Sequence, residues 1–149
     1  MNKIDKILKE NGDKLSEDEI LKYKIKKVEK LLRSYKENLS ESKILTYRLS
    51  LQAVRYDKEN VQTSNKSDLS DVAAAREERL KKINEEIFYT ESMLDTLSPK
   101  ERYVIEGFYI NKLPLIKIAA KIGYTSEKGT WKFKGKIINQ LVDFLENII

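Results

Sequence analysis

Apolar residues recur every three or four positions along most of this chain, which is the spacing of one face of an α-helix. The first long stretch follows Ser16, which together with Glu19 has the spacing of a capping box. Heptad spacing keeps one stripe turned toward a partner helix, so it predicts a long helix packed against another. The residues of this seam are Leu21, Ile25, Val28, Leu32, Tyr35 and Leu39. A short amphipathic helix is predicted ahead of it over residues 1–12.

The apolar stripe changes phase after Leu39 and continues through Ile44, Tyr47, Leu51 and Val54. This shift predicts a break or a stutter in the helix near residues 40–42. The next segment, 55–68, is polar and rich in Asn and Ser, and it predicts a loop. A second periodic stretch over 69–96 predicts a connecting helix.

Two periodic helices joined by a loop can bury their apolar stripes in two ways. The helical segment 1–54 and the connecting helix 69–96 can pack on each other as a hairpin. Alternatively, they can pair with a second copy of the chain as a dimeric coiled coil. The pattern alone does not separate a hairpin from a homodimer.

The strongest helix signals lie in residues 97–149. Ser98, Pro99 and Glu101 are the residue types expected at the N-cap, N1 and N3 positions of a helix. We expect this helix to end near Asn111 and to bury Val104, Ile105, Phe108 and Tyr109.

A second, shorter helix is predicted after Pro114, with an apolar face formed by Ile116, Ile118, Ala119 and Ile122. Gly123 stands where a helix end needs a left-handed residue, and Thr125 or Ser126 then caps a third helix. A short helix, a tight turn containing Gly and a longer helix form a helix-turn-helix motif. The predicted fold class is therefore all-α, with long N-terminal helices and a helix-turn-helix domain over 97–149.

The third helix is predicted to be amphipathic and basic, with four lysines against the single acid Glu127. Its predicted buried side consists of Trp131, Phe133, Ile137, Ile138, Leu141 and Leu145. Helix-turn-helix proteins place such a helix in the major groove of double-stranded DNA, where lysines bind phosphates and polar residues near the helix start reach base edges. The candidate DNA-binding residues are Thr125, Ser126, Lys128, Gly129, Thr130, Lys132, Lys134 and Lys136.

Two glycines are unexpected in this helix. Gly129 and Gly135 each cost roughly 0.5–1 kcal/mol of helix stability relative to Ala. Either glycine allows DNA to approach the backbone closely, or the helix is frayed until DNA binds.

The composition of the chain limits which ligands it can bind and which reactions it can catalyse. The chain of 149 residues has a formal net charge of +5 and a pI of about 9.2, which permits nucleic-acid binding. It has no Cys and no His, which excludes disulfides, Cys/His zinc sites and catalysis by His. It also lacks a Gly-rich phosphate loop, so we expect neither an enzyme nor a bound metal or cofactor.

We expect the protein to be cytoplasmic and to have no membrane partner. No apolar run approaches the ~20 residues of a membrane-spanning helix. The N-terminus lacks the apolar stretch of a signal peptide.

The segment LSPKERYVIEGFYI followed by IKIAAKIGYT resembles region 4 of bacterial sigma factors. There, Leu-Ser-Pro-x-Glu-Arg-x-Val-Ile precedes a helix-turn-helix that binds promoter DNA. The whole chain is similar to small phage transcriptional regulators of the RinA and ArpU type, with a helical N-terminal half and a sigma-like end. The resemblance implies activation of a late phage or prophage operon and contact with host RNA polymerase. This sequence departs from the pattern at Lys117, where Glu is usual, and in the recognition stretch 128–133.

Three functions follow from these patterns. The first is a sequence-specific transcriptional regulator, and the second is a DNA-packaging protein like a phage small terminase subunit. The third is a helical adaptor that does not bind DNA. A terminase subunit forms a large ring whereas a regulator is a monomer or dimer, so oligomer size separates the first two.

Overall fold

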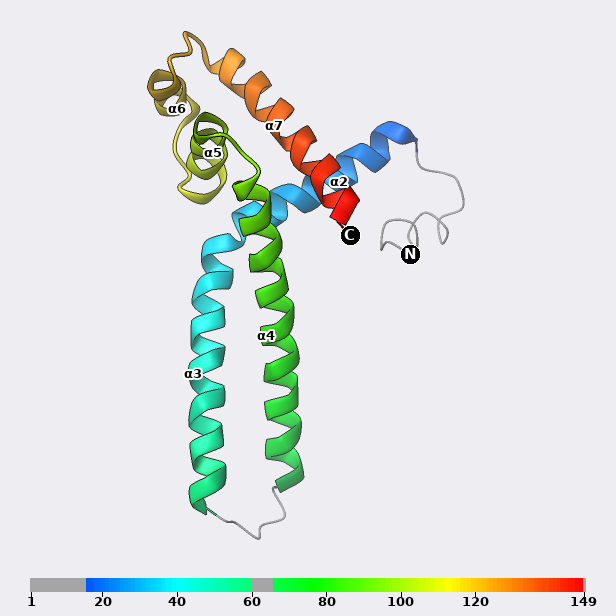
Figure 1. Ribbon diagram of the computed structural model, residues 1–149, viewed down its shortest axis with the longest axis vertical. Coiled ribbons are helices and arrows are strands. Elements are labelled where there is room, and N and C mark those ends of the chain that lie inside the picture. The colour runs from blue at the N-terminus through cyan, green and yellow to red at the C-terminus, as the bar shows by residue number, and fades with distance from the viewer. Residues whose placement is uncertain (1–15, 60–65, 149) are drawn as a thin grey trace. The chain divides into compact units, whose positions relative to one another are not determined.

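The computed structural model describes residues 16–59 and 66–148, and within these ranges the chain is helical without a strand (Figure 1). The all-α prediction is therefore confirmed. The elements are α2 (Glu17–Arg33), α3 (Tyr35–Glu59), α4 (Lys66–Asp95), α5 (Pro99–Ile105), the π-helical segment η1 (Glu106–Ile110), α6 (Leu115–Ile122) and α7 (Glu127–Ile148). The helix predicted over residues 1–12 lies outside the described residues.

The described helices divide into two compact units. The C-terminal unit consists of α2 together with the chain from Ser92 onward, and the hairpin unit spans Ser34–Glu91. The boundaries between the units fall inside the predicted segments 1–54 and 69–96 and not at their ends. The reason for the first is that α2 packs against α7 and η1 and so belongs to the C-terminal unit.

Of the two alternatives predicted near residues 40–42, the helix break is wrong, and a stutter within a continuous helix agrees with the structure. Helix α2 ends at Arg33, and α3 runs through these positions without interruption. The first turn of α3 is closed by the Asn38 N–H, which donates to the Ser34 carbonyl oxygen at 2.8 Å. The change of phase marks a change in which face of the chain is buried, and a helix can change its buried face without ending.

The predicted loop 55–68 is also too long. Helix α3 continues to Glu59 and α4 begins at Lys66, so both ends of the segment are helical. Lys, Glu and Gln are polar but favour helices, and composition alone therefore places helix ends poorly.

In the hairpin unit, α3 and α4 run antiparallel beside each other (Figure 1). Their seam is bridged mainly by polar side chains, and its buried apolar residues include Leu45 and Ile83. The Arg79 guanidinium donates to both carboxylate oxygens of Glu41, at 3.1 and 3.3 Å. Further bridging pairs include Tyr35–Glu91, Asn38–Glu86, Ser42–Asn84 and Gln52–Arg76.

The apolar stripe predicted on the second half of the first helical stretch is exposed. Its members are Ile44, Tyr47, Leu51 and Val54. The seam of the hairpin instead uses positions such as Ser42, Leu45 and Gln52, which lie on the neighbouring face of α3. The intrachain hairpin therefore leaves this stripe uncovered.

The core of the C-terminal unit brings together apolar residues from its helices. Helix α2 contributes Val28, Leu31 and Leu32, and α7 contributes several residues of its buried side, including Ile137 and Leu141. Val104 and Ile105 of α5 and Ile118 of α6 also belong to this core. Lys24 forms an ion pair with Glu146, which joins α2 to the end of α7. No helix in the described ranges has both the length and the apolar character to cross a membrane.

Candidate nucleic-acid interface

The capping box predicted at the start of α5 is confirmed by both of its hydrogen bonds. The Glu101 N–H donates to Ser98 Oγ at 3.3 Å, and the Ser98 N–H donates to Glu101 Oε1 at 3.0 Å. Pro99 is at the first helical position. The helix then widens into η1 and stops at Asn111, whose N–H donates to the Glu106 carbonyl oxygen at 2.8 Å. The predicted end is therefore correct, although the last turn is a π-turn.

A tight turn joins α6 to α7, as the sequence predicts. Gly123 has a φ of 81°, and its N–H donates to the carbonyl oxygen of Ala119. Such left-handed backbone favours glycine. Ser126 caps α7, because its Oγ accepts the Gly129 N–H at 3.1 Å. Ile118 and Ala119 are buried between the packed helices, whereas Ile116, predicted on the same apolar face, is 63% exposed.

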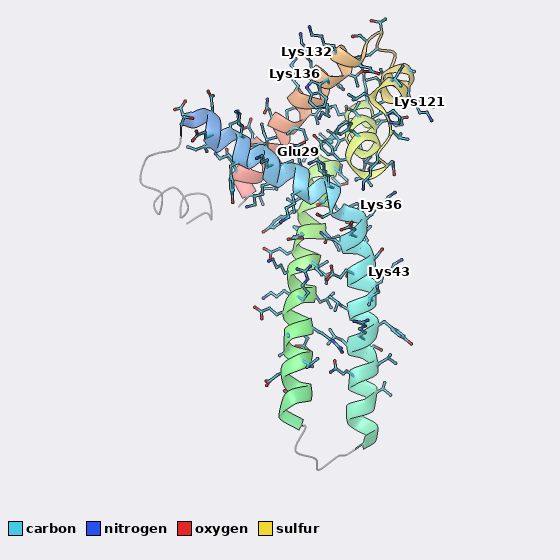
Figure 2. All side chains as sticks on the ribbon, turned by 180° about the vertical axis from the view of Figure 1, so that it is seen from behind. Glu29, Lys36, Lys43, Lys121, Lys132 and Lys136 are labelled. Carbon is cyan, nitrogen blue, oxygen red and sulfur yellow. The ribbon has the colours of Figure 1, made fainter. Side chains whose placement is uncertain are left out.

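Helix α7 exposes a basic surface made of Lys128, Lys132 and Lys136. The three lysines occupy successive turns of one face, and Figure 2 shows Lys132 and Lys136 on the outer side of the helix. Thr125 and Ser126 are exposed at the start of this helix. Five of the predicted site residues therefore lie together on the surface.

Thr130 does not belong to this surface. Its side chain is fully buried at 0% exposure, and its hydroxyl donates to the Ser126 carbonyl oxygen at 3.2 Å. Helical periodicity places position 130 with Lys134, Ile137 and Leu141 on the inner face of α7. The prediction that Thr130 reaches DNA is wrong.

Lys134 is likewise buried, with 5% exposure, and is not a surface cation. Its ammonium lies 3.7 Å from the ring centroid of Trp131 and 4.1 Å from that of Phe108, which are cation–π contacts. It also donates a hydrogen bond to Tyr109 Oη at 3.2 Å. The Tyr109 hydroxyl in turn donates to Glu29 Oε2 at 2.8 Å.

This network shifts two pKa values. Burial lowers the pKa of Lys134, Glu29 opposes that shift, and Arg33 adds to it. Burial and the hydrogen bond to Glu29 raise the pKa of the Tyr109 hydroxyl. Sequence reasoning missed the network because its members come from α2, η1 and α7, which are far apart in the chain.

Trp131 was predicted to lie in the core but is 54% exposed. Its ring covers the Lys134 ammonium and meets Phe108 edge-on at 6.1 Å between ring centroids. The indole therefore forms an outer wall over a buried charge. The amphipathic pattern counts every large apolar residue as buried, and it therefore assigns Trp131 to the core although the indole is half exposed.

Gly129 is explained by packing at the helix start. A Cβ at this position would lie 3.3 Å from Ser126 Oγ and 3.6 Å from Tyr124 Cδ2. The glycine makes room for the capping hydroxyl, so its presence does not require an approaching ligand.

Most of the charges along α7 oppose its helix dipole. The exposed lysines occupy its N-terminal half, and Asp143 and Glu146 lie in its C-terminal half, while only Glu127 in the first turn favours the dipole. A helix N-terminus carries partial positive charge and favours acidic neighbours, by about 0.3–1 kcal/mol per charge. Intrahelical electrostatics therefore do not account for this arrangement, which concentrates positive potential where an anion can reach the helix start.

Comparisons with protein-family models, with curated proteins and with solved structures find no match for this chain. Within the described ranges, acidic residues do not form a group of three or more that could hold a metal ion. The surface consists of a short row of ammonium groups beside the exposed residues Thr125 and Ser126, and this arrangement suits an extended anion.

Proposed function

We propose that this protein is a sequence-specific DNA-binding transcriptional regulator that inserts α7 into the major groove of a duplex. The observation that carries the proposal is the exposed row of Lys128, Lys132 and Lys136 directly after the Gly123 turn. Phosphates lie along the edges of the major groove, and ammonium groups on successive helical turns suit them.

The roles of the site residues differ. Lys132 and Lys136 bind phosphates and set the orientation of the helix on the duplex. Thr125, Ser126 and Lys128 lie at the start of α7, the part of a recognition helix that contacts base edges in helix-turn-helix proteins. Thr130 and Lys134 are buried on the inner face of α7, where they hold the helix in place and do not contact DNA.

The resemblance of residues 97–125 to sigma-factor region 4 adds the biological context. It supports a role as an activator of late phage or prophage genes, which acts by binding near a promoter and contacting host RNA polymerase. A protein of this kind works in the cytoplasm as a monomer or a homodimer.

Selection of duplexes from a random library by the purified full-length chain tests the proposal. We expect one sequence family to be enriched and to bind more tightly than a scrambled duplex at physiological salt. The logarithm of its affinity should fall linearly with the logarithm of salt concentration, with a slope of about −3 or steeper for three or more neutralised phosphates. Equal, weak binding to every duplex would contradict sequence specificity.

The molar mass in solution separates regulation from packaging. Light scattering should give a monomer or dimer for a regulator. A large ring would instead favour the terminase-like function and would contradict our proposal.

A further inference from the structure

Gly135 differs from the other glycines of the described chain because nothing inside the molecule requires it. Gly123 has left-handed backbone, Gly129 makes room for the capping Ser126, and a Cβ at Gly107 would lie 3.4 Å from the side chain of Ile118. A Cβ at Gly135 would meet no atom within 4 Å.

The position is nevertheless one where glycine is unfavourable. Gly135 lies in the middle of α7, in regular helix, far from either end. Glycine there loses more backbone freedom on folding than alanine does and exposes its peptide group to water. An alanine would fit and would stabilise the helix, so folding does not explain this residue.

The neighbours of Gly135 on the helix surface belong to the basic side of α7. Lys132 precedes it by three residues and Asn139 follows it by four, the spacings at which helical side chains adjoin. Lys128 lies two turns before it on the same side, and the half-exposed Trp131 borders the gap. The missing side chain therefore leaves an open patch of helix backbone beside exposed cations.

We propose that Gly135 is the point at which the sugar–phosphate backbone of a DNA duplex approaches α7 most closely. The absent Cβ lets a phosphate come against the helix backbone while Lys132 and Lys128 bind the same strand. This inference rests on the proposed DNA-binding function. It adds the residue that determines how closely α7 approaches the DNA backbone.

The test combines stability and affinity measurements on full-length Gly135→Ala, Gly135→Leu and Ser50→Ala. Ser50 is exposed on α3 of the hairpin unit, away from the basic surface of α7, so Ser50→Ala is the control for a helix-stabilising change that does not touch DNA. The probe is a short duplex that wild-type protein has enriched from a random library, with a scrambled duplex beside it.

We expect Gly135→Ala to raise the thermal midpoint and to weaken binding of the enriched duplex by about ten-fold, with a salt slope reduced by about one unit. Gly135→Leu should weaken binding further, because the longer side chain holds the strand farther away. Ser50→Ala should bind like the wild type.

Unchanged affinity in both Gly135 variants would overturn the inference while leaving the proposed function intact. A lowered thermal midpoint in Gly135→Ala would also overturn it, because it would reveal an internal reason for the glycine. If wild-type protein enriched no duplex, the proposed function would fail first, and this inference would fail with it.

Discussion

At the scale of single residues, the same substitution has opposite expected effects at two glycines of the C-terminal unit. A Cβ would meet no atom within 4 Å at either Gly123 or Gly135, so packing does not distinguish them. Their backbones do, because Gly123 has a φ of 81° and Gly135 is in regular helix.

Gly123→Ala should destabilise the protein by about 1–2 kcal/mol, because an L-residue in left-handed backbone carries that strain. Gly135→Ala should stabilise it by about 0.5–1 kcal/mol. Chemical denaturation followed by circular dichroism measures both changes. A stabilising Gly123→Ala would show that the turn does not have the left-handed geometry described, and a destabilising Gly135→Ala would show that Gly135 is needed for folding.

Buried Lys134 makes stability depend on pH. Its folded-state pKa lies below the ordinary value of 10.5, so between those two values the unfolded chain binds more protons than the folded one. The stability of the wild type should therefore rise with pH over this range. The raised pKa of Tyr109 acts oppositely above pH 10.0, where the unfolded chain loses the phenolic proton first.

Lys134→Met tests this account. Methionine fills a similar volume without a charge, so the variant should be as stable as the wild type at neutral pH, or up to about 2 kcal/mol more stable. The difference should move in favour of the wild type as the pH rises toward 10, in parallel denaturation curves. Lys132→Met, at an exposed site, should show no such trend. A large loss of stability in Lys134→Met would mean that the cation–π contacts outweigh the desolvation of the ammonium.

At the scale of elements, α7 separates its lysines into two classes by the 3.6-residue period. Three are exposed and one is buried, although all four stand within ten residues of the chain. Only the exposed class should contribute to the salt dependence of DNA binding.

Lys132→Ala should weaken DNA binding and reduce the salt slope by about one unit, because one phosphate contact is lost. Lys43→Ala is a matched control, since Lys43 is an exposed lysine on α3 of the hairpin unit (Figure 2). Titrations at several salt concentrations measure both slopes. An unchanged slope for Lys132→Ala would remove Lys132 from the phosphate contacts.

At the scale of the whole molecule, the C-terminal unit depends on a helix that is distant in sequence. Val28, Leu31 and Leu32 of α2 are buried in this unit, and Glu29 accepts the hydrogen bond from Tyr109. A helix-turn-helix domain confined to residues 97–149, as the sequence predicts, would leave the surface that meets α2 open to water.

A fragment of residues 97–149 should therefore be largely unfolded, because it loses the burial that several apolar side chains supply, each contributing about 1.5–3 kcal/mol. Circular dichroism and the dispersion of amide proton shifts in nuclear magnetic resonance distinguish the outcomes, with the full-length chain as reference. A fragment with native-like dispersion would show that α2 is dispensable for this fold.

The sequence by itself determined the features that depend on local chemistry. The capping box of Ser98 and Glu101, the left-handed turn at Gly123 and a cap at Thr125 or Ser126 were all predictable, because each involves residues within a few positions of one another. The structure uses Ser126 for that cap. The all-α class followed similarly from periodicity and the choice of helix formers.

The tertiary structure alone decided which face of each helix is buried. Thr130 and Lys134 lie inside because α7 packs with that side against α2, α5 and α6, and the ammonium of Lys134 is accommodated by aromatic rings and the Tyr109 hydroxyl. The seam of the hairpin is formed by polar pairs, so the apolar stripe at Ile44 stays exposed. Periodicity shows that a helix has two faces, but the partner helices determine where the boundary between them falls, and those partners are distant in the chain.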